Sequence, residues 1–153
     1  MRAGFCKPMT NKHKSITASD TPVLIVDDTP QYSQVLVKIL SKAFGYRDIT
    51  VVDNLQEAYA ALASKDCRFR LIFVDYRFPS GDTGGELLLR LKAERLLEGR
   101  VAFLITSEPS PENLKQVVAA GAFGLIAKPF DREQLKKQLL RADMHLGEVM
   151  EEF

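Results

Sequence analysis

Five short runs of mainly aliphatic residues, separated by segments of helix length, set the strongest limit on what this chain can fold into. The runs span residues 23–26, 49–52, 71–74, 101–105 and 125–127. Each run is apolar at successive positions, as in strands of a parallel sheet that is covered on both faces. The alternation of strands and helices predicts an α/β fold. Right-handed crossovers favour a doubly wound, flavodoxin-like parallel sheet of order 2-1-3-4-5, flanked by five helices.

The segments between these runs carry helix signals. Thr29 and Pro30 stand where a cap and a first helical residue are expected, and apolar residues then repeat at helical spacing until residues 44–45. Asp131 opens the last helix, with Gln134 in position to complete a capping box. The other helices are predicted over residues 55–64, over residues 86–97 and from residue 111 onward.

The 153 residues suit a single domain with short extensions at its ends. Residues 1–20 are polar and basic and show no hydrophobic period, so we expect a flexible basic leader. Residues 21–142 are predicted to form the folded domain, and residues 143–153 to extend its last helix. This extension carries apolar side chains without an evident packing partner. Three interpretations stay open for it: a homodimer surface, an interdomain helix of a longer protein, and a frayed end.

Charge and cysteine content exclude several classes of protein. The net charge of +1 gives no reason to expect direct contact with nucleic acid or with a membrane surface. The two cysteines, Cys6 and Cys67, are too few for a disulfide framework or a metal knuckle. No apolar run approaches the roughly 20 residues that span a bilayer, and the N-terminus lacks the apolar stretch of a signal peptide. We therefore expect a cytoplasmic protein.

Polar side chains with complementary chemistry stand at four strand ends. Asp27 and Asp28 follow the first run, Asp75 the third, Thr106 the fourth and Lys128 the fifth. In an open parallel sheet, the carboxyl ends of the strands meet at one edge, where ligands bind. Each residue alone has an ordinary interpretation as a cap, a turn former or a surface charge. Their joint placement at one edge instead predicts a functional site.

This set of groups suits phosphoryl chemistry supported by a hard cation. Three neighbouring carboxylates require a compensating cation or a bound proton. Oxygen-rich sites of this kind suit Mg²⁺, and a carboxylate can act as the nucleophile that accepts a phosphoryl group. The first strand is followed by Asp27-Asp28-Thr29-Pro30 rather than by a glycine-rich phosphate loop. We therefore expect the phosphoryl donor to bring its own binding surface.

With these motifs in this order, the chain resembles the response-regulator receiver domains of two-component signalling. The resemblance covers about residues 22–142. It rests on the segments LIVDD (24–28), VDYRFP (74–79), ITSE (105–108) and GAFGLIAKPF (121–130).

The resemblance implies a role for each acid of the site. Asp75 is expected to be the phospho-acceptor. Asp28 and Asp75 would bind Mg²⁺ directly, together with the backbone carbonyl of Arg77. Asp27 would bind the same ion through a water molecule.

The resemblance also implies how the signal is received and passed on. Thr106 would bind the phosphoryl group, and Lys128 would bridge first to Asp75 and then to the phosphate, with a cis peptide bond before Pro129. The phosphoryl group would come from a histidine kinase or a phosphotransfer protein. A downstream protein would bind the face formed by the fourth helix, the fifth strand and the fifth helix. Such a protein is a signalling switch rather than an enzyme, and the only reactions that it catalyses are its own phosphorylation and dephosphorylation.

Two positions depart from the usual pattern of the family. Leu125 stands three residues before the lysine, where an aromatic switch residue is usual, so we hypothesise that the readout depends more on the loop after the fourth strand. Arg77 and Glu108, two residues after Asp75 and Thr106 respectively, are expected to border the entrance to the phosphate. As a pair, they could screen the aspartyl-phosphate from water, or they could simply be two solvated charges.

Three alternative functions stay open at this point. The chain could be the receiver part of a longer effector protein. It could be a Mg²⁺-dependent phosphohydrolase with an aspartate nucleophile, although Arg77 occupies the place where such enzymes commonly carry a second acid. It could also be a binding module with a vestigial site, although all five site residues are present.

Overall fold

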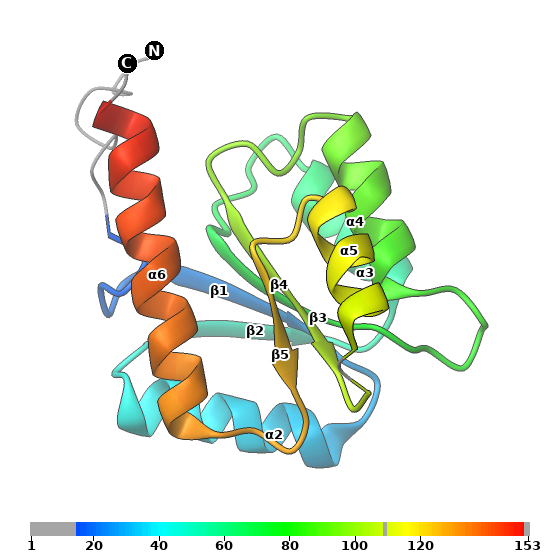
Figure 1. Ribbon diagram of the computed structural model, residues 1–153, viewed down its shortest axis with the longest axis horizontal. Coiled ribbons are helices and arrows are strands. Elements are labelled where there is room, and N and C mark those ends of the chain that lie inside the picture. Colours follow the sequence, from blue (N-terminus) through cyan, green and yellow to red (C-terminus); the bar gives the residue numbers. More distant parts are fainter. Residues whose placement is uncertain (1–14, 109, 152–153) are drawn as a thin grey trace.

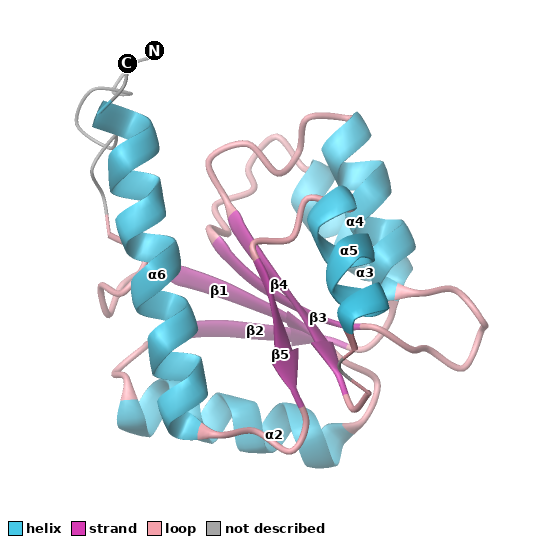
Figure 2. Ribbon diagram, in the orientation of Figure 1, coloured by secondary structure: helices cyan, strands magenta, loops and turns pink. Residues whose placement is uncertain are grey.

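The computed structural model describes residues 15–108 and 110–151, and these residues form a parallel sheet covered by helices on both faces (Figures 1 and 2). The strand order is β2-β1-β3-β4-β5, which confirms the predicted topology. All four pairings of neighbouring strands are parallel. The strands are β1 (Pro22–Val26), β2 (Asp48–Val52), β3 (Leu71–Asp75), β4 (Val101–Thr106) and β5 (Gly124–Ala127).

Five α-helices connect and flank the strands, as the sequence predicts. They are α2 (Pro30–Lys38), α3 (Leu55–Ala63), α4 (Gly84–Ala93), α5 (Pro111–Ala119) and α6 (Arg132–Glu151), and a π-helical segment η1 (Ile39–Ala43) continues α2. In Figure 1, α2 and α6 lie on one face of the sheet, and α3, α4 and α5 lie on the other. Within residues 15–108 and 110–151, none of the helices combines the length and the apolar character needed to cross a membrane.

The core consists of two hydrophobic clusters, one on each face of the sheet. Along β3, Leu71 and Phe73 belong to the cluster beneath α2 and α6, whereas Ile72 and Val74 belong to the cluster beneath the other three helices. Every residue of β3 is buried. This two-sided burial is why the strand reads as a continuous apolar run, since successive side chains point to opposite faces.

Both bounds of helix α4 differ from the prediction, and local capping sets its start. Helix α4 begins at Gly84, two residues earlier than predicted, because Thr83 and Glu86 form a capping box, and it ends at residue 93 rather than 97. Thr29 precedes α2 as expected, but its side chain makes no capping hydrogen bond. Asp131 does cap α6, where its Oδ1 accepts from the Glu133 N–H at 2.9 Å.

The described end of the predicted leader is part of the folded domain. Ile16 is fully buried in the cluster beneath α2 and α6. Its N–H donates to Asp143 Oδ1 at 2.8 Å, and its carbonyl accepts from the Tyr46 hydroxyl at 2.7 Å. The predicted boundary at residue 20 is therefore too late, because residues 15–20 supply a packing partner for the extended α6. Residues 1–14, which are the rest of the predicted leader, lie outside the described part of the chain.

Candidate functional site

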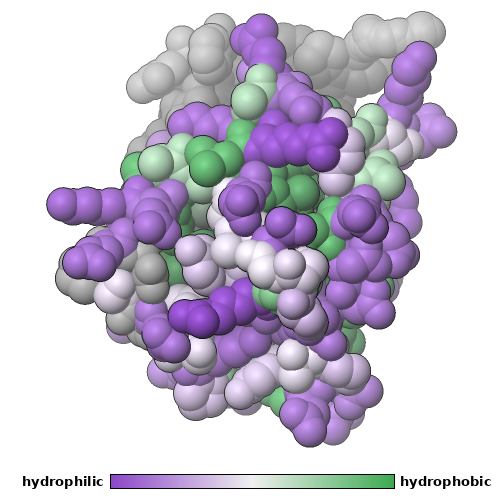
Figure 3. All heavy atoms as spheres, turned by 90° about the vertical axis from the view of Figure 1, so that its right-hand side faces the viewer, coloured by the Kyte–Doolittle hydropathy of each residue, from purple (hydrophilic) through white to green (hydrophobic). Residues whose placement is uncertain are grey.

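The carboxyl ends of four strands bring the predicted site residues to one edge of the sheet. Asp27 and Asp28 follow β1, Lys128 follows β5, and Asp75 and Thr106 are the last residues of β3 and β4. A cleft of about 280 Å³ opens there, lined by Asp28, Thr29, Asp75, Tyr76, Arg77, Phe78, Pro79, Thr106, Ser107 and Lys128. The loop after β3 projects from this side in Figure 1, and Figure 3 shows that the side is largely hydrophilic.

The three acids form a compact cluster that could hold a cation. One carboxylate oxygen from each of Asp27, Asp28 and Asp75 lies within 4.8 Å of the others. Asp27 is only 2% exposed, and its Oδ1 accepts from the Thr29 N–H at 2.9 Å. Its Oδ2 is buried and has no hydrogen-bond partner. Because buried polar atoms are nearly always paired, this oxygen and its two neighbours fit a hard, oxygen-binding ion such as Mg²⁺.

Lys128 supplies the positive charge that the structure places among these acids. Its Nζ lies 3.2 Å from Asp75 Oδ2 and 3.6 Å from Asp27 Oδ2, and its side chain is 7% exposed. The Lys128–Pro129 peptide bond is cis. The Lys128 N–H donates to the Thr106 carbonyl at 2.8 Å, which ties the loop after β5 to the end of β4. A nearly buried lysine in this position offsets part of the negative charge of the cluster.

The environment of Asp75 makes its negative charge costly without a further cation. Burial and, second, the charge of Asp27 raise the pKa of the Asp75 carboxyl to about 6. Lys128 opposes this rise, through its charge and its hydrogen bond, without cancelling it. A metal ion at the cluster would favour the ionised form, which is the form that can act as a nucleophile.

The expected gating residues lie at the mouth of the cleft. Arg77 Nη2 is 3.6 Å from Glu108 Oε1, and the two side chains are 73% and 70% exposed. The Glu108 N–H also donates to Thr106 Oγ1 at 3.1 Å, which fixes the buried threonine hydroxyl beside the loop after β4. Arg77 and Glu108 therefore meet above the site, but as exposed groups whose direct coupling is weak.

Leu125 lies outside the cleft. It is partly buried and packs against the cluster beneath α3, α4 and α5. Its carbonyl accepts from Gln138 Nε2 of α6 at 3.5 Å. The position expected to act as a switch thus contacts helices on both faces of the sheet, although it does not line the site.

Two residues near the site were missed in the sequence interpretation. The ring of Tyr32, in the first turn of α2, lies over Lys128, with Nζ 4.0 Å from the ring centroid. Gly84 opens α4 so close to β3 that a Cβ there would lie 2.2 Å from the Asp75 carbonyl oxygen. A glycine pair directly before a helix could have signalled the close approach at Gly84. No local pattern signals the contact of Tyr32.

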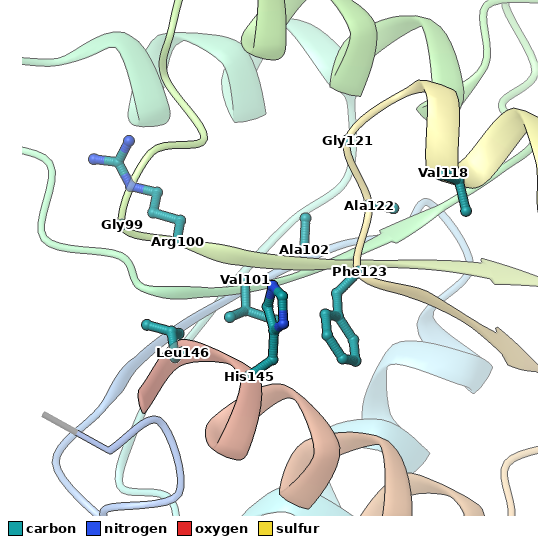
Figure 4. A pocket seen from close by; sticks show the side chains of 10 residues that line it. All are labelled: Gly99, Arg100, Val101, Ala102, Val118, Gly121, Ala122, Phe123, His145 and Leu146. Carbon is teal, nitrogen blue, oxygen red and sulfur yellow. The ribbon is translucent and has the colours of Figure 1, made fainter. Parts of the chain in front are cut away.

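A second pocket, of about 450 Å³, lies away from this edge, between the start of β4, the start of β5 and the late part of α6 (Figure 4). Its most reactive lining groups already have partners. Arg100 Nε donates to the Phe69 carbonyl at 2.8 Å, and the guanidinium points away from the pocket in Figure 4. The His145 ring packs against Phe123, with ring centroids 5.6 Å apart. The pocket is therefore a weaker candidate site than the acidic cleft.

Comparisons with known proteins agree with the geometry of the cleft. A family model described as the response regulator receiver domain matches residues 23–140. The chemotaxis protein CheY-3 of Vibrio cholerae is 29% identical over 126 residues, which cover 82% of this chain and 94% of that protein. The phosphate regulon transcriptional regulatory protein PhoB of Pseudomonas aeruginosa is 32% identical, over 76% of this chain and 49% of its own length.

Solved structures give the same answer for the fold. The chemotaxis protein CheY4 of Vibrio cholerae matches with a TM-score of 0.69 and 31% identity, covering 80% of this chain and 98% of that one. A CheY-like receiver domain protein from Methanospirillum hungatei matches with a TM-score of 0.71 and 27% identity, covering 86% and 99% of the two chains. The likeness therefore extends over nearly the whole of each solved structure.

Proposed function

The chain belongs to the response regulator receiver family and is a signalling protein rather than an enzyme, and from that premise we propose that it is switched by phosphorylation of Asp75. The observation that carries the proposal is the position of Asp75, which lies in an acidic cluster with Lys128 Nζ 3.2 Å from its Oδ2. Family membership removes the phosphohydrolase alternative.

In the proposed reaction, a carboxylate oxygen of Asp75 attacks the phosphorus of a phosphohistidine on a kinase or phosphotransfer protein. The new O–P bond forms as the N–P bond to the donor breaks, and the leaving imidazole nitrogen keeps the bonding electron pair. Lys128 balances negative charge on a phosphoryl oxygen, and the Thr106 hydroxyl donates a hydrogen bond to another. Because Asp27-Asp28-Thr29-Pro30 follows β1 in place of a glycine-rich phosphate loop, the donor protein supplies the rest of the binding surface.

The metal site of this proposal uses the acidic cluster. Asp28, Asp75 and the backbone carbonyl of Arg77 would hold Mg²⁺ directly, and Asp27 would act through a water molecule. When bound, the ion would neutralise charge on the transferred group. The buried Asp27 Oδ2, which has no hydrogen-bond partner, and the separation of at most 4.8 Å among the three carboxylates support this assignment.

Mass measurement after incubation with a small phosphodonor and Mg²⁺ tests the proposal. We expect the wild-type chain to gain one phosphoryl group and Asp75→Ala to gain none. Asp66→Ala, which removes an exposed acid outside the cleft, is the matched control and should behave as wild type. A wild-type chain that gains no phosphoryl group would favour a vestigial binding module. An equal gain in Asp75→Ala would show that Asp75 is not the acceptor.

The proposed output is contact with a downstream protein in the cytoplasm, through the face formed by α5, β5 and α6. Leu125 supports this choice, because it joins β5 to the cluster beneath α5 and bonds to α6 through its carbonyl. We propose that the loop after β4 carries more of the readout than Leu125, since that loop begins directly after Thr106 and carries Glu108. A structure with a phosphate mimic in which Leu125 changes rotamer while this loop stays in place would contradict the proposal.

Two architectures fit this output. The first is a receiver that acts alone, because the match covers 94% of the length of CheY-3. A receiver joined to an effector is the second, because the chain spans about half the length of the transcriptional regulator PhoB. The length of the natural reading frame distinguishes the two.

A further inference from the structure

Tyr32 closes the side of Lys128 that the acids leave open. Lys128 Nζ lies 3.2 Å from Asp75 Oδ2, 3.6 Å from Asp27 Oδ2 and 4.0 Å from the centroid of the Tyr32 ring. Two carboxylates and one aromatic face thus surround the ammonium group, which explains why the lysine side chain is only 7% exposed. The tyrosine itself is 38% exposed, so its ring stands between the ammonium and solvent.

The Tyr32 ring is held in place by the loop that carries the lysine. Phe130, two residues after Lys128, packs edge-on against Tyr32 with ring centroids 6.4 Å apart and an interplanar angle of 86°. Phe130 is partly buried against the cluster beneath α2 and α6. Tyr32 belongs to α2, whereas Lys128 and Phe130 follow β5. The aromatic pair therefore fixes the start of α2 against the lysine loop.

We propose that Tyr32 is a positioning residue for Lys128, which holds the ammonium group where it can meet the phosphoryl group on Asp75. This inference rests on the proposed function. A cation over an aromatic face is attracted by the ring quadrupole, and more strongly where water is excluded. Without the ring, water reaches the ammonium, and the lysine chain gains rotamers that point away from Asp75. Ordering it again during phosphoryl transfer slows the reaction.

Phosphorylation rates of two ring variants test the proposal. Tyr32→Leu removes the aromatic face and Tyr32→Phe keeps it, while Val35→Ala, one turn along α2 at a side chain 46% exposed, is the matched surface control. With acetyl phosphate and Mg²⁺, we expect Tyr32→Leu to be phosphorylated roughly threefold to tenfold more slowly than wild type, given the usual strength of cation–π contacts. Tyr32→Phe should keep most of the wild-type rate, and Val35→Ala all of it.

A spectroscopic measurement separates positioning from a general structural effect. Ring current from Tyr32 should shift the ε-methylene protons of Lys128 upfield in wild type and in Tyr32→Phe, and this shift should disappear in Tyr32→Leu. Equal thermal midpoints for the variants would show that the fold is kept. The inference is overturned if Tyr32→Leu reacts at the wild-type rate, if Tyr32→Phe is as slow as Tyr32→Leu, or if wild type shows no upfield shift. A wild-type chain that accepts no phosphoryl group would instead overturn the proposed function.

Discussion

At the scale of single residues, the surroundings of Asp75 in the unphosphorylated site disfavour its ionised form. Its pKa is raised to about 6 by burial and by Asp27, whereas an unfolded aspartate titrates near 3.9. Between about pH 4 and pH 6, the folded chain therefore binds more protons at this position than the unfolded chain does. The stability contributed by the protonated carboxyl is fully present below pH 4 and is lost as the pH rises through 6.

Asp75→Asn should therefore stabilise the metal-free chain at pH 7.5, because it removes a carboxylate that folding makes costly to ionise. We expect a gain on the order of 1 to 2 kcal/mol in the free energy of unfolding at pH 7.5, and little gain near pH 4. Urea unfolding at the two pH values, with EDTA present, measures the difference. A variant that is equally or less stable than wild type at pH 7.5 would contradict the assigned cause.

The exposed pair of Arg77 and Glu108 gives a second prediction at this scale. If the pair screens the aspartyl-phosphate, the double variant Arg77→Ala/Glu108→Ala should lose its phosphoryl group roughly twofold to fivefold faster, as a coupling below about 1 kcal/mol allows. The control is Arg90→Ala/Glu94→Ala, which removes another exposed ion pair, with Arg90 Nε 3.2 Å from Glu94 Oε2 at the end of α4. An unchanged half-life in the first variant would leave Arg77 and Glu108 as two solvated charges.

At the scale of elements, the start of α4 is built directly onto the acceptor strand. The Gly84 N–H donates to the Tyr76 carbonyl at 2.8 Å, and a Cβ at Gly84 would also lie 2.7 Å from Val74 Cγ1. The backbone of β3 cannot move aside without moving Asp75. The helix start and the acceptor are thus one packed unit, which the capping box of Thr83 and Glu86 holds in register.

Gly84→Ala should push the start of α4 away from β3, because the added methyl group meets backbone rather than a flexible side chain. We expect a loss of about 1 to 3 kcal/mol in stability, as overpacked positions usually show, and slower phosphorylation of Asp75. Gly85→Ala is the matched control, since its Cβ would meet the Tyr76 ring at 3.5 Å and Thr83 Oγ1 at 3.7 Å, which are ordinary contacts, and alanine favours the helix. Equal unfolding midpoints for the two variants in urea would show that the close approach has no energetic weight.

At the scale of the whole molecule, ligand binding at the carboxyl edge of the sheet should raise the free energy of global unfolding. The acids stand at the carboxyl ends of β1 and β3, so an ion that binds only the folded state opposes unfolding of the entire sheet. It would also offset the repulsion that raises the pKa of Asp75.

Mg²⁺ at roughly 10 to 100 times its dissociation constant should raise the free energy of unfolding by about 1 to 3 kcal/mol at pH 7.5. EDTA should reverse the gain, and NaCl of equal ionic strength should not reproduce it. Asp28→Asn should lose the gain, and Asp66→Asn, at an exposed acid elsewhere, should keep it. A gain that survives in Asp28→Asn would place the ion at another site.

The amino-acid sequence alone predicts the strand order, the two-sided core and the edge at which Asp28, Asp75, Thr106 and Lys128 meet. The core and the edge follow from local properties, since the apolar period and the position at a strand end are readable without knowing the neighbours. The strand order follows from the handedness of the crossovers between parallel strands. The place of Ile16 in the core depends on long-range contacts, because its partner Asp143 lies 127 residues away. The place of Tyr32 over Lys128 was likewise decided by packing of α2 against the loop after β5, a contact between distant segments that no local pattern encodes.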